Sequence, residues 1–151
     1  MKIIEQEEVR KLLQPKDCIQ LMAEALKGLE SGEYAQPARL ITVMPNTAKF
    51  GFMPAYVGDY FGAKVISAFA PNMGTKYPSH IGYVMLFESA HSTVAGMIEA
   101  GSITEIRTGA VSAAATDLLA RKDSHKLALI GAGAQRARIW LRSVRFVILL
   151  P

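Results

Sequence analysis

The chain has 151 residues, of which 50% are hydrophobic and 20% are charged, a composition typical of a soluble globular protein with one core. One cysteine, Cys18, excludes an intramolecular disulfide, and three histidines without cysteine or acidic neighbours at ligand spacing predict no metal site. The first ten residues are rich in charge, and no apolar run reaches the roughly 18 residues of a membrane span. We therefore expect a cytoplasmic protein without a signal peptide or a membrane anchor.

The net charge of +4 arises at the carboxyl-terminal end of the chain. Every aspartate and glutamate lies at or before Asp123, and the charged residues after it are all basic: Lys126, Arg136, Arg138, Arg142 and Arg145. A surface that binds nucleic acid needs Lys and Arg clustered on a folded face, with aromatic side chains among them for single strands. An excess confined to one terminal segment does not fit that pattern, so we expect no nucleic-acid partner.

Residues 15–31 are predicted to form an amphipathic helix. Pro15 suits the first turn, Asp17 favours the positive end of the helix dipole, and Gly32 can close the other end. The apolar residues recur at the three-and-four spacing of one helix face: Ile19, Met22, Ala23, Leu26 and Leu29.

Short β-rich segments follow at 39–44, 50–56, 63–69, 82–88 and 93–99. Turn residues separate several of them, as at Pro45 and Asn46 or at Gly58 and Asp59. Consecutive short strands with tight connections predict a mostly antiparallel sheet, with the first helix packed against it.

The pattern changes after Ser102. Residues 103–121 are rich in Ala and Leu and predict a long helix, whose alanines leave room for another element to approach closely. Residues 126–130 form an apolar run of the kind found in buried parallel strands. A glycine-containing turn, 131–135, follows directly and precedes a segment, 135–141, that can be helical.

The position of this turn suggests a dinucleotide-binding site. In such a turn the first glycine permits the tight reversal, the second lets the backbone approach a pyrophosphate, and the helix N-terminus supplies free N–H groups. The alternative is an ordinary strand-to-helix turn that uses glycine. Two parts of the pattern are missing, because Arg136 stands where a small residue is expected and no acid follows Asp123 to bind a ribose.

Several motifs lie in a specific order along residues 1–135. They are GAKV at 62–65, PSHIG at 78–82, LFE at 86–88, ITEIRTGA at 103–110 and IGAGAQ at 130–135. Arg107 and Thr108, on the helix before the glycine turn, are the most specific part. Together these motifs resemble the ornithine cyclodeaminase/mu-crystallin family.

The resemblance implies an α/β fold with two domains. Residues 1–122 are expected to form an α+β domain for substrate binding and dimerisation, with a mostly antiparallel sheet. Residues 123–151 are expected to begin a truncated Rossmann domain with its first strand and helix, and they diverge from the family after 135. Proteins of the family are longer and usually homodimeric, so the resemblance covers only their amino-terminal part.

The resemblance also implies an NAD- or NADP-dependent parent enzyme. The first hypothesis is an ornithine cyclodeaminase-like ammonia-lyase that acts on a small amino acid by hydride transfer at the α-carbon, imine formation and loss of ammonia. An imine or ketimine reductase, or an amino-acid dehydrogenase, is the alternative among enzymes. A non-catalytic mu-crystallin-like protein that binds a dinucleotide or ligand, or an inactive fragment, is the alternative of another class.

The expected site residues follow from the same resemblance. Arg39, Lys64 and Arg107 match cations that bind the substrate, and guanidinium and ammonium groups suit its carboxylate. Ser79 and His80 match loop positions near the cofactor, where Arg107 also lies. The pyrophosphate turn is matched by Gly131, Gly133, Ala134 and Gln135. Without the resemblance, a solvated surface position is the commoner role for such charged residues.

No catalytic residue is assigned, because the catalytic aspartate of the family has no matching position here. After Gln135 the sequence departs abruptly into an arginine-rich segment, as a change of reading frame would produce; the coding DNA tests this hypothesis. One strand and one helix of a Rossmann domain cannot cover each other's apolar faces. We therefore expect this chain to be inactive and to bind NAD(H) weakly or not at all.

Overall fold

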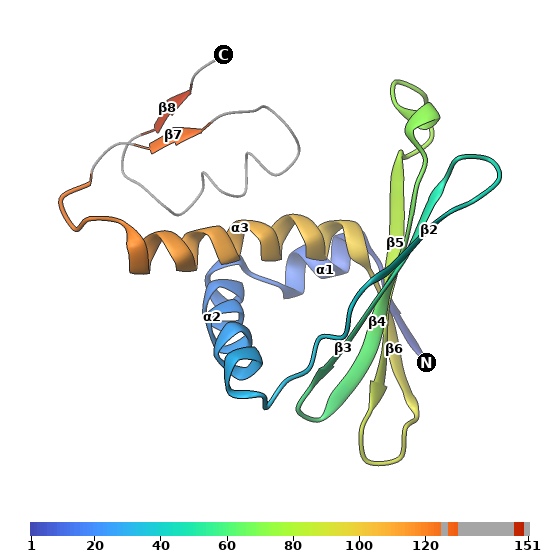
Figure 1. Cartoon of the computed structure of the whole chain (residues 1–151), viewed down its shortest axis with the longest axis horizontal. Helices are drawn as coiled ribbons and strands as arrows, with labels where there is room; N and C mark the ends of the chain where they lie inside the picture. Colours follow the sequence, from blue (N-terminus) through green and yellow to red (C-terminus); the bar gives the residue numbers. More distant parts are fainter. Residues whose placement is uncertain (125–126, 130–146, 150–151) are drawn as a thin grey trace.

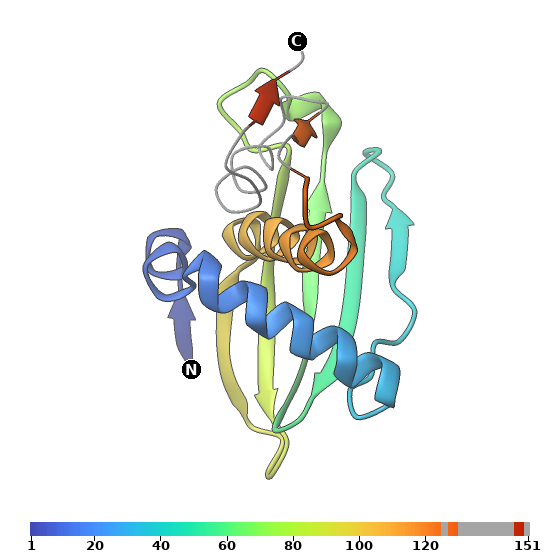
Figure 2. The same ribbon diagram turned by 90° about the vertical axis from the view of Figure 1, so that its left-hand side faces the viewer.

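The computed structural model describes residues 1–124, 127–129 and 147–149. In this part of the chain a six-stranded sheet carries helices on one of its faces (Figures 1 and 2). In chain order the elements are β1 (Lys2–Ile4), α1 (Gln6–Leu12), α2 (Pro15–Ser31), β2 (Leu40–Val43), β3 (Lys49–Val57), β4 (Tyr60–Ala68), η1 (Ala70–Asn72), β5 (His80–Glu88), β6 (Val94–Glu99), α3 (Ala100–Leu119), β7 (Leu127–Leu129) and β8 (Val147–Leu149).

The strand order of the sheet is β1-β6-β5-β4-β3-β2. All neighbours are antiparallel except β1 and β6, which are parallel. The predicted mostly antiparallel sheet is therefore confirmed, and each predicted strand overlaps an observed one. The sequence did not predict β1, because this short segment is a strand only through pairing with distant backbone, as between Lys2 and Gly96.

Helix α2 has the boundaries that its sequence predicts. Pro15 lies in its first turn, and Gly32 closes it in the left-handed conformation with φ of 80°. Its apolar face packs against α3, where Cys18 contacts Ile106 and Ala110 and all three side chains are at most 3% exposed. The small side chain of Ala110 lets the two helices approach closely, as the alanine-rich sequence suggests.

Helix α3 begins at Ala100, three residues before its predicted start at 103. Glu99, at the end of β6, caps it, because its carboxylate accepts hydrogen bonds from the backbone N–H groups of Gly101 and Ser102. The strand therefore passes directly into the helix, which starts at the sheet and runs away from it (Figure 1). Neither α3 nor any other described helix combines the length and apolar character needed to cross a membrane.

The second face of the sheet, called here the outer face, carries none of the described helices (Figure 2). Side chains alternate between the two faces along a strand, and residues paired across strands share a face. Lys64 points towards the helices, so Val65 and its partners in β3 and β5 point away from them. The large exposed apolar side chains on the outer face are Ile3, Leu40, Phe50, Phe52, Tyr56, Ile81, Met85 and Val94.

Strands β7 and β8 pair in parallel. The first corresponds to the predicted strand at 126–130, and parallel pairing agrees with the expected α/β fold. The predicted turn at 131–135 and the predicted helix at 135–141 lie outside the described residues.

The close contact of α2 and α3 can be tested by adding volume at Ala110. We expect Ala110→Leu to lower the free energy of unfolding by about 1–3 kcal/mol, because the extra methyl groups have no space beside Cys18 and Ile106. Urea denaturation followed by circular dichroism measures the change. Ala120→Leu, at the exposed end of α3, is the matched control and should change stability little; equal effects at both positions would contradict the tight packing.

Candidate anion-binding site

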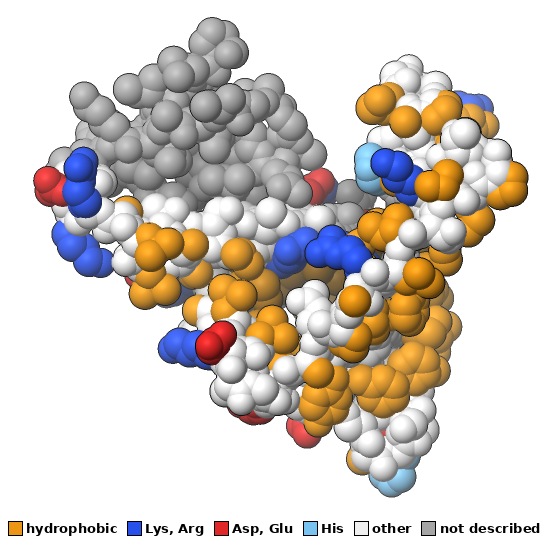
Figure 3. Space-filling model, viewed as in Figure 1, with side chains coloured by type: hydrophobic (Ala, Val, Ile, Leu, Met, Phe, Trp, Pro, Cys, Tyr) orange, Lys and Arg blue, Asp and Glu red, His pale blue; other side chains and the backbone are white. Residues whose placement is uncertain are grey.

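Three basic side chains from separate elements line one cavity. Arg39 lies directly before β2, Lys64 in the middle of β4 and Arg107 on α3. The cavity has a volume of about 630 Å³ and opens between the sheet and helices α2 and α3. Figure 3 shows Lys and Arg side chains gathered in the hollow where the helices approach the sheet. The structure therefore brings together the three cations that the sequence proposed as substrate ligands, and we call this space the cationic cavity.

Local geometry places each of these groups. The alternation of β4 turns Lys64 to the helix side of the sheet, where its cross-strand partners are Met53 and Val84. On α3, Ile103 and Arg107 are four residues apart and so share one face of the helix, and both line the cavity. Arg107 is exposed, whereas Lys64 is half-buried.

The rest of the cationic cavity is apolar or neutral. Its apolar wall includes Met22 from α2, Met53 from β3 and Ile103 from α3. Gln36 and Thr104 add an amide and a hydroxyl group. Among the described residues that line this cavity, none is acidic.

The charge arrangement alters the protonation of Lys64. Burial lowers the pKa of its ammonium group, and the positive charges of Arg107 and then Arg39 lower this pKa further. The Lys64 Nζ donates a hydrogen bond to the Thr104 Oγ1 at 3.4 Å. A neutral hydroxyl does not offset a positive charge, so an anion that entered the cavity would relieve repulsion among the three cations.

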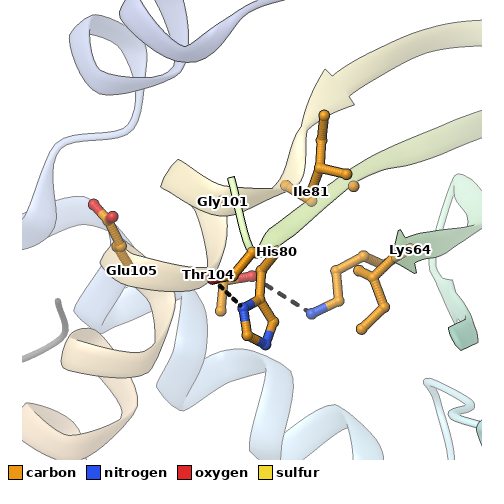
Figure 4. A pocket seen from close by; sticks show the side chains of 10 residues that line it. Lys64, His80, Ile81, Gly101, Thr104 and Glu105 are labelled. Atoms are coloured by element: carbon orange, nitrogen blue, oxygen red, sulfur yellow. Dashed lines mark hydrogen bonds between the residues drawn. The ribbon is translucent and has the colours of Figure 1, made fainter. Parts of the chain in front are cut away.

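A second cavity, of about 480 Å³, adjoins the first and shares Lys64 and Thr104 with it. Ser79 and His80, at the start of β5, line it, and the side chains of His80 and Lys64 reach into the same space (Figure 4). The Ser79 Oγ lies 3.1 Å from the His80 Nδ1. Glu105 also lines this cavity, where its carboxylate meets Arg10 of α1 at 3.4 Å.

Sequence reasoning missed part of this site. It did not single out Thr104, although the three-residue spacing from Arg107 places both side chains on one helix face. It treated Met22 and Met53 only as side chains that fill the core and gave neither a place in the site. The predicted pyrophosphate turn (Gly131, Gly133, Ala134 and Gln135) lies outside the described residues.

Comparison with known proteins identifies the family. The model of the ornithine cyclodeaminase/mu-crystallin family matches residues 1–146. The chain belongs to this family.

Relatives with known names support this assignment. Ketimine reductase mu-crystallin from Mus musculus is 34% identical over 117 residues, which make up 76% of this chain and 37% of the relative. Among solved structures, Δ1-pyrroline-2-carboxylate reductase from Thermococcus litoralis, in complex with NADH and L-proline, is 29% identical with a TM-score of 0.88, covering 99% of this chain and 49% of that one. An archaeal alanine dehydrogenase dimer with bound NAD is 25% identical with a TM-score of 0.87, covering 92% and 43%.

Two facts follow from the comparison with these relatives. The chain spans less than half the length of each of them. Both solved structures contain a nicotinamide dinucleotide, so the family is one of NAD(P)-dependent proteins.

The lowered pKa of Lys64 predicts that this residue reduces stability. We expect Lys64→Met to raise the free energy of unfolding at neutral pH, because methionine occupies similar space without a charge to desolvate. Since the pKa of Lys64 is lower in the folded than in the unfolded chain, wild-type stability rises as the pH passes from the folded-state pKa towards about 10.4. The difference in free energy of unfolding between Lys64→Met and the wild type should therefore decrease with increasing pH.

Urea denaturation at several pH values between neutral pH and about pH 10 measures this difference in free energy of unfolding. Lys49→Met, at an exposed position on β3, is the matched control and should leave the pH dependence of stability as in the wild type. The electrostatic explanation would be contradicted if Lys64→Met were less stable than the wild type by an amount that does not depend on pH.

Proposed function

We propose that this chain supplies the substrate-binding part of an NAD(P)-dependent enzyme that transfers hydride at the α-carbon of a small amino acid or its imine. The observation that carries the proposal is the convergence of Arg39, Lys64 and Arg107 on one cavity. We assign residues 1–122 to the substrate-binding and dimerisation domain and residues 123–151 to the start of the cofactor domain.

The cations suit one carboxylate of the substrate. A guanidinium group can donate two parallel hydrogen bonds to a carboxylate, and the ammonium of Lys64 adds a compact third donor. Binding of the anion would raise the pKa of Lys64 again, because a negative charge beside the ammonium favours its protonated form. The bound carboxylate would fix the α-carbon next to the border with the second cavity, which Lys64 and Thr104 share.

The described residues fit a nicotinamide ring in the second cavity. Ile66 offers an apolar wall, and Ser79 and His80 offer a hydroxyl and an imidazole group for a carboxamide. When bound, NAD(P) supplies the acceptor or donor of hydride. Arg107 is proposed to lie close to both ligands, and the turn formed by Gly131, Gly133, Ala134 and Gln135 is proposed to hold the diphosphate.

Two outcomes of this chemistry remain in the family. A cyclodeaminase oxidises the α-carbon, closes a ring with loss of ammonia and returns the hydride to the cyclic imine, whereas a ketimine reductase or an amino-acid dehydrogenase transfers hydride without ring closure. Membership of the family supports both equally. A non-catalytic protein of the mu-crystallin kind would use the same cavity for binding alone, and turnover of an imine with NADH would distinguish it from the enzymes.

Carboxylate binding is tested by titrating the chain with L-proline and following amide shifts by NMR. We expect Arg107→Met to weaken binding by about tenfold to a hundredfold, which corresponds to roughly 1.5–3 kcal/mol for a hydrogen bond to a charged group. Arg121→Met is the matched control, because the side chain of Arg121 is 86% exposed and meets only Asp123, at 3.7 Å, among the described residues.

The proposal fails if L-proline binds the wild type and the Arg107→Met protein equally well. It also fails if Arg121→Met weakens binding as much as Arg107→Met does. The first result would show that the carboxylate binds away from Arg107. The second would show that the weaker binding comes from the lower net charge of the protein and not from a contact with Arg107.

The outer face of the sheet is proposed to form a homodimer. A soluble monomer rarely exposes an apolar patch that spans several strands, so such a patch indicates an interface. Leu40 is 65% exposed and Ile81 is 55% exposed on this face, and Phe61 stacks on Phe87 there with ring centroids 5.3 Å apart. The related alanine dehydrogenase is a dimer, which supports a second copy of the chain as the partner.

The dimer is tested by placing a charge on the outer face, at Phe52 of β3. We expect Phe52→Lys to shift the protein from dimer to monomer in analytical ultracentrifugation, because the new ammonium would be buried without a partner. Leu118→Lys is the matched control, because Leu118 is 78% exposed near the end of α3 and away from the outer face. A wild type that stays monomeric over the accessible concentration range would refute this interface.

A further inference from the structure

We infer that the cationic cavity selects an amino or imino acid whose side chain is apolar and uncharged, and that it disfavours diamino acids. The inference rests on the proposed function, because it assumes that the three cations hold the substrate carboxylate. It adds the chemical class of the remaining part of the substrate.

The apolar lining of the cationic cavity carries the first argument. Met22, Met53 and Ile103 come from α2, β3 and α3, so three different elements direct apolar side chains into one cavity. All three are half-buried. A hydrocarbon side chain of the substrate would be stabilised by removing its apolar surface from water against these side chains. The two flexible methionines can adjust to aliphatic chains or rings of different shape.

The charges of the cavity carry the second argument. To bind here, an ammonium group on the substrate side chain would have to lose its hydration. The cavity that it would enter contains three cations, and none of its described lining residues is acidic. The acid of the neighbouring cavity, Glu105, is paired with Arg10 at 3.4 Å. Gln36 and Thr104 can accept a hydrogen bond but do not neutralise a charge. An ammonium group would therefore be both desolvated and repelled.

The nature of the side chain decides which reaction can follow. The α-amino acid loses hydride from its α-carbon to NAD(P)⁺ and a proton from its nitrogen, which gives an iminium acid, NAD(P)H and H⁺. Cyclodeamination then needs a second amine within the substrate, which attacks the α-carbon while ammonia leaves. An alkyl side chain has no such nucleophile, so no ring closes, and the iminium acid is either reduced back to the amino acid or hydrolysed by water to a 2-oxo acid and ammonium. The cavity thus favours the dehydrogenase or imine reductase alternative over the cyclodeaminase.

Two matched ligands test the selection. L-norvaline and L-ornithine differ only in the δ-amino group of ornithine. We expect L-norvaline to bind the full chain about tenfold more tightly or better, as measured by NMR titration, because the unpaired δ-ammonium group opposes binding of ornithine.

A variant pair at Met53 makes the test independent of the absolute affinities. Met53→Glu places a carboxylate in the apolar wall and should reverse the preference, so that L-ornithine binds about tenfold more tightly than L-norvaline. Met53→Gln has the same shape without the charge, and it should not favour L-ornithine. Circular dichroism of both variants verifies that they fold.

Each result has a defined meaning. Equal binding of both ligands by the wild type, or a Met53→Glu protein whose preference does not move towards L-ornithine, overturns the inference and leaves the carboxylate site in place. Failure of L-norvaline, L-ornithine and L-proline alike to bind overturns the proposed function as well. Arg107→Met separates the two cases, because loss of the carboxylate site weakens both ligands, whereas loss of selection affects only their ratio.

Discussion

The central physical constraint on the site is the repulsion between three positive charges that line one cavity. Arg39, Lys64 and Arg107 line one cavity whose described lining includes no acid, and burial together with the two guanidinium groups lowers the pKa of Lys64. Such a group of like charges persists only where rigid elements hold it. The repulsion is relieved by an anion, so the same constraint that destabilises the empty cavity favours a carboxylate ligand.

The fold supplies the necessary rigidity through helix packing. Cys18 and Ala110 let α2 and α3 approach closely, and this contact fixes the helix that carries Arg107. Glu99 caps α3 where β6 ends, so the start of the helix is attached to the sheet that carries Lys64. The position of one cation relative to another therefore follows from backbone elements and not from long flexible side chains alone.

Alternation along the strands gives the two faces of the sheet different roles. In β4, Lys64 faces the helices and lines the cationic cavity, whereas Val65 faces away from them. The helix side therefore combines charge with an apolar wall, which suits a small amphiphilic acid. The outer face has apolar side chains on successive strands and is left without a helix in the described part of the chain, which suits association of two copies.

The sequence by itself determined the elements with local patterns: helix α2 with its Pro15 start and Gly32 end, the antiparallel strands, and the basic residues that the family resemblance marked. These depend on periodicity and turn chemistry over a few neighbouring residues. Only the tertiary structure decided the pairing of β1 with β6, the start of α3 at its Glu99 cap, and the grouping of Met22 with Met53 in the cavity that the three cations line. The physical reason is that packing and strand pairing bring together residues that are far apart in the chain. A local sequence pattern does not predict which distant residue each one contacts.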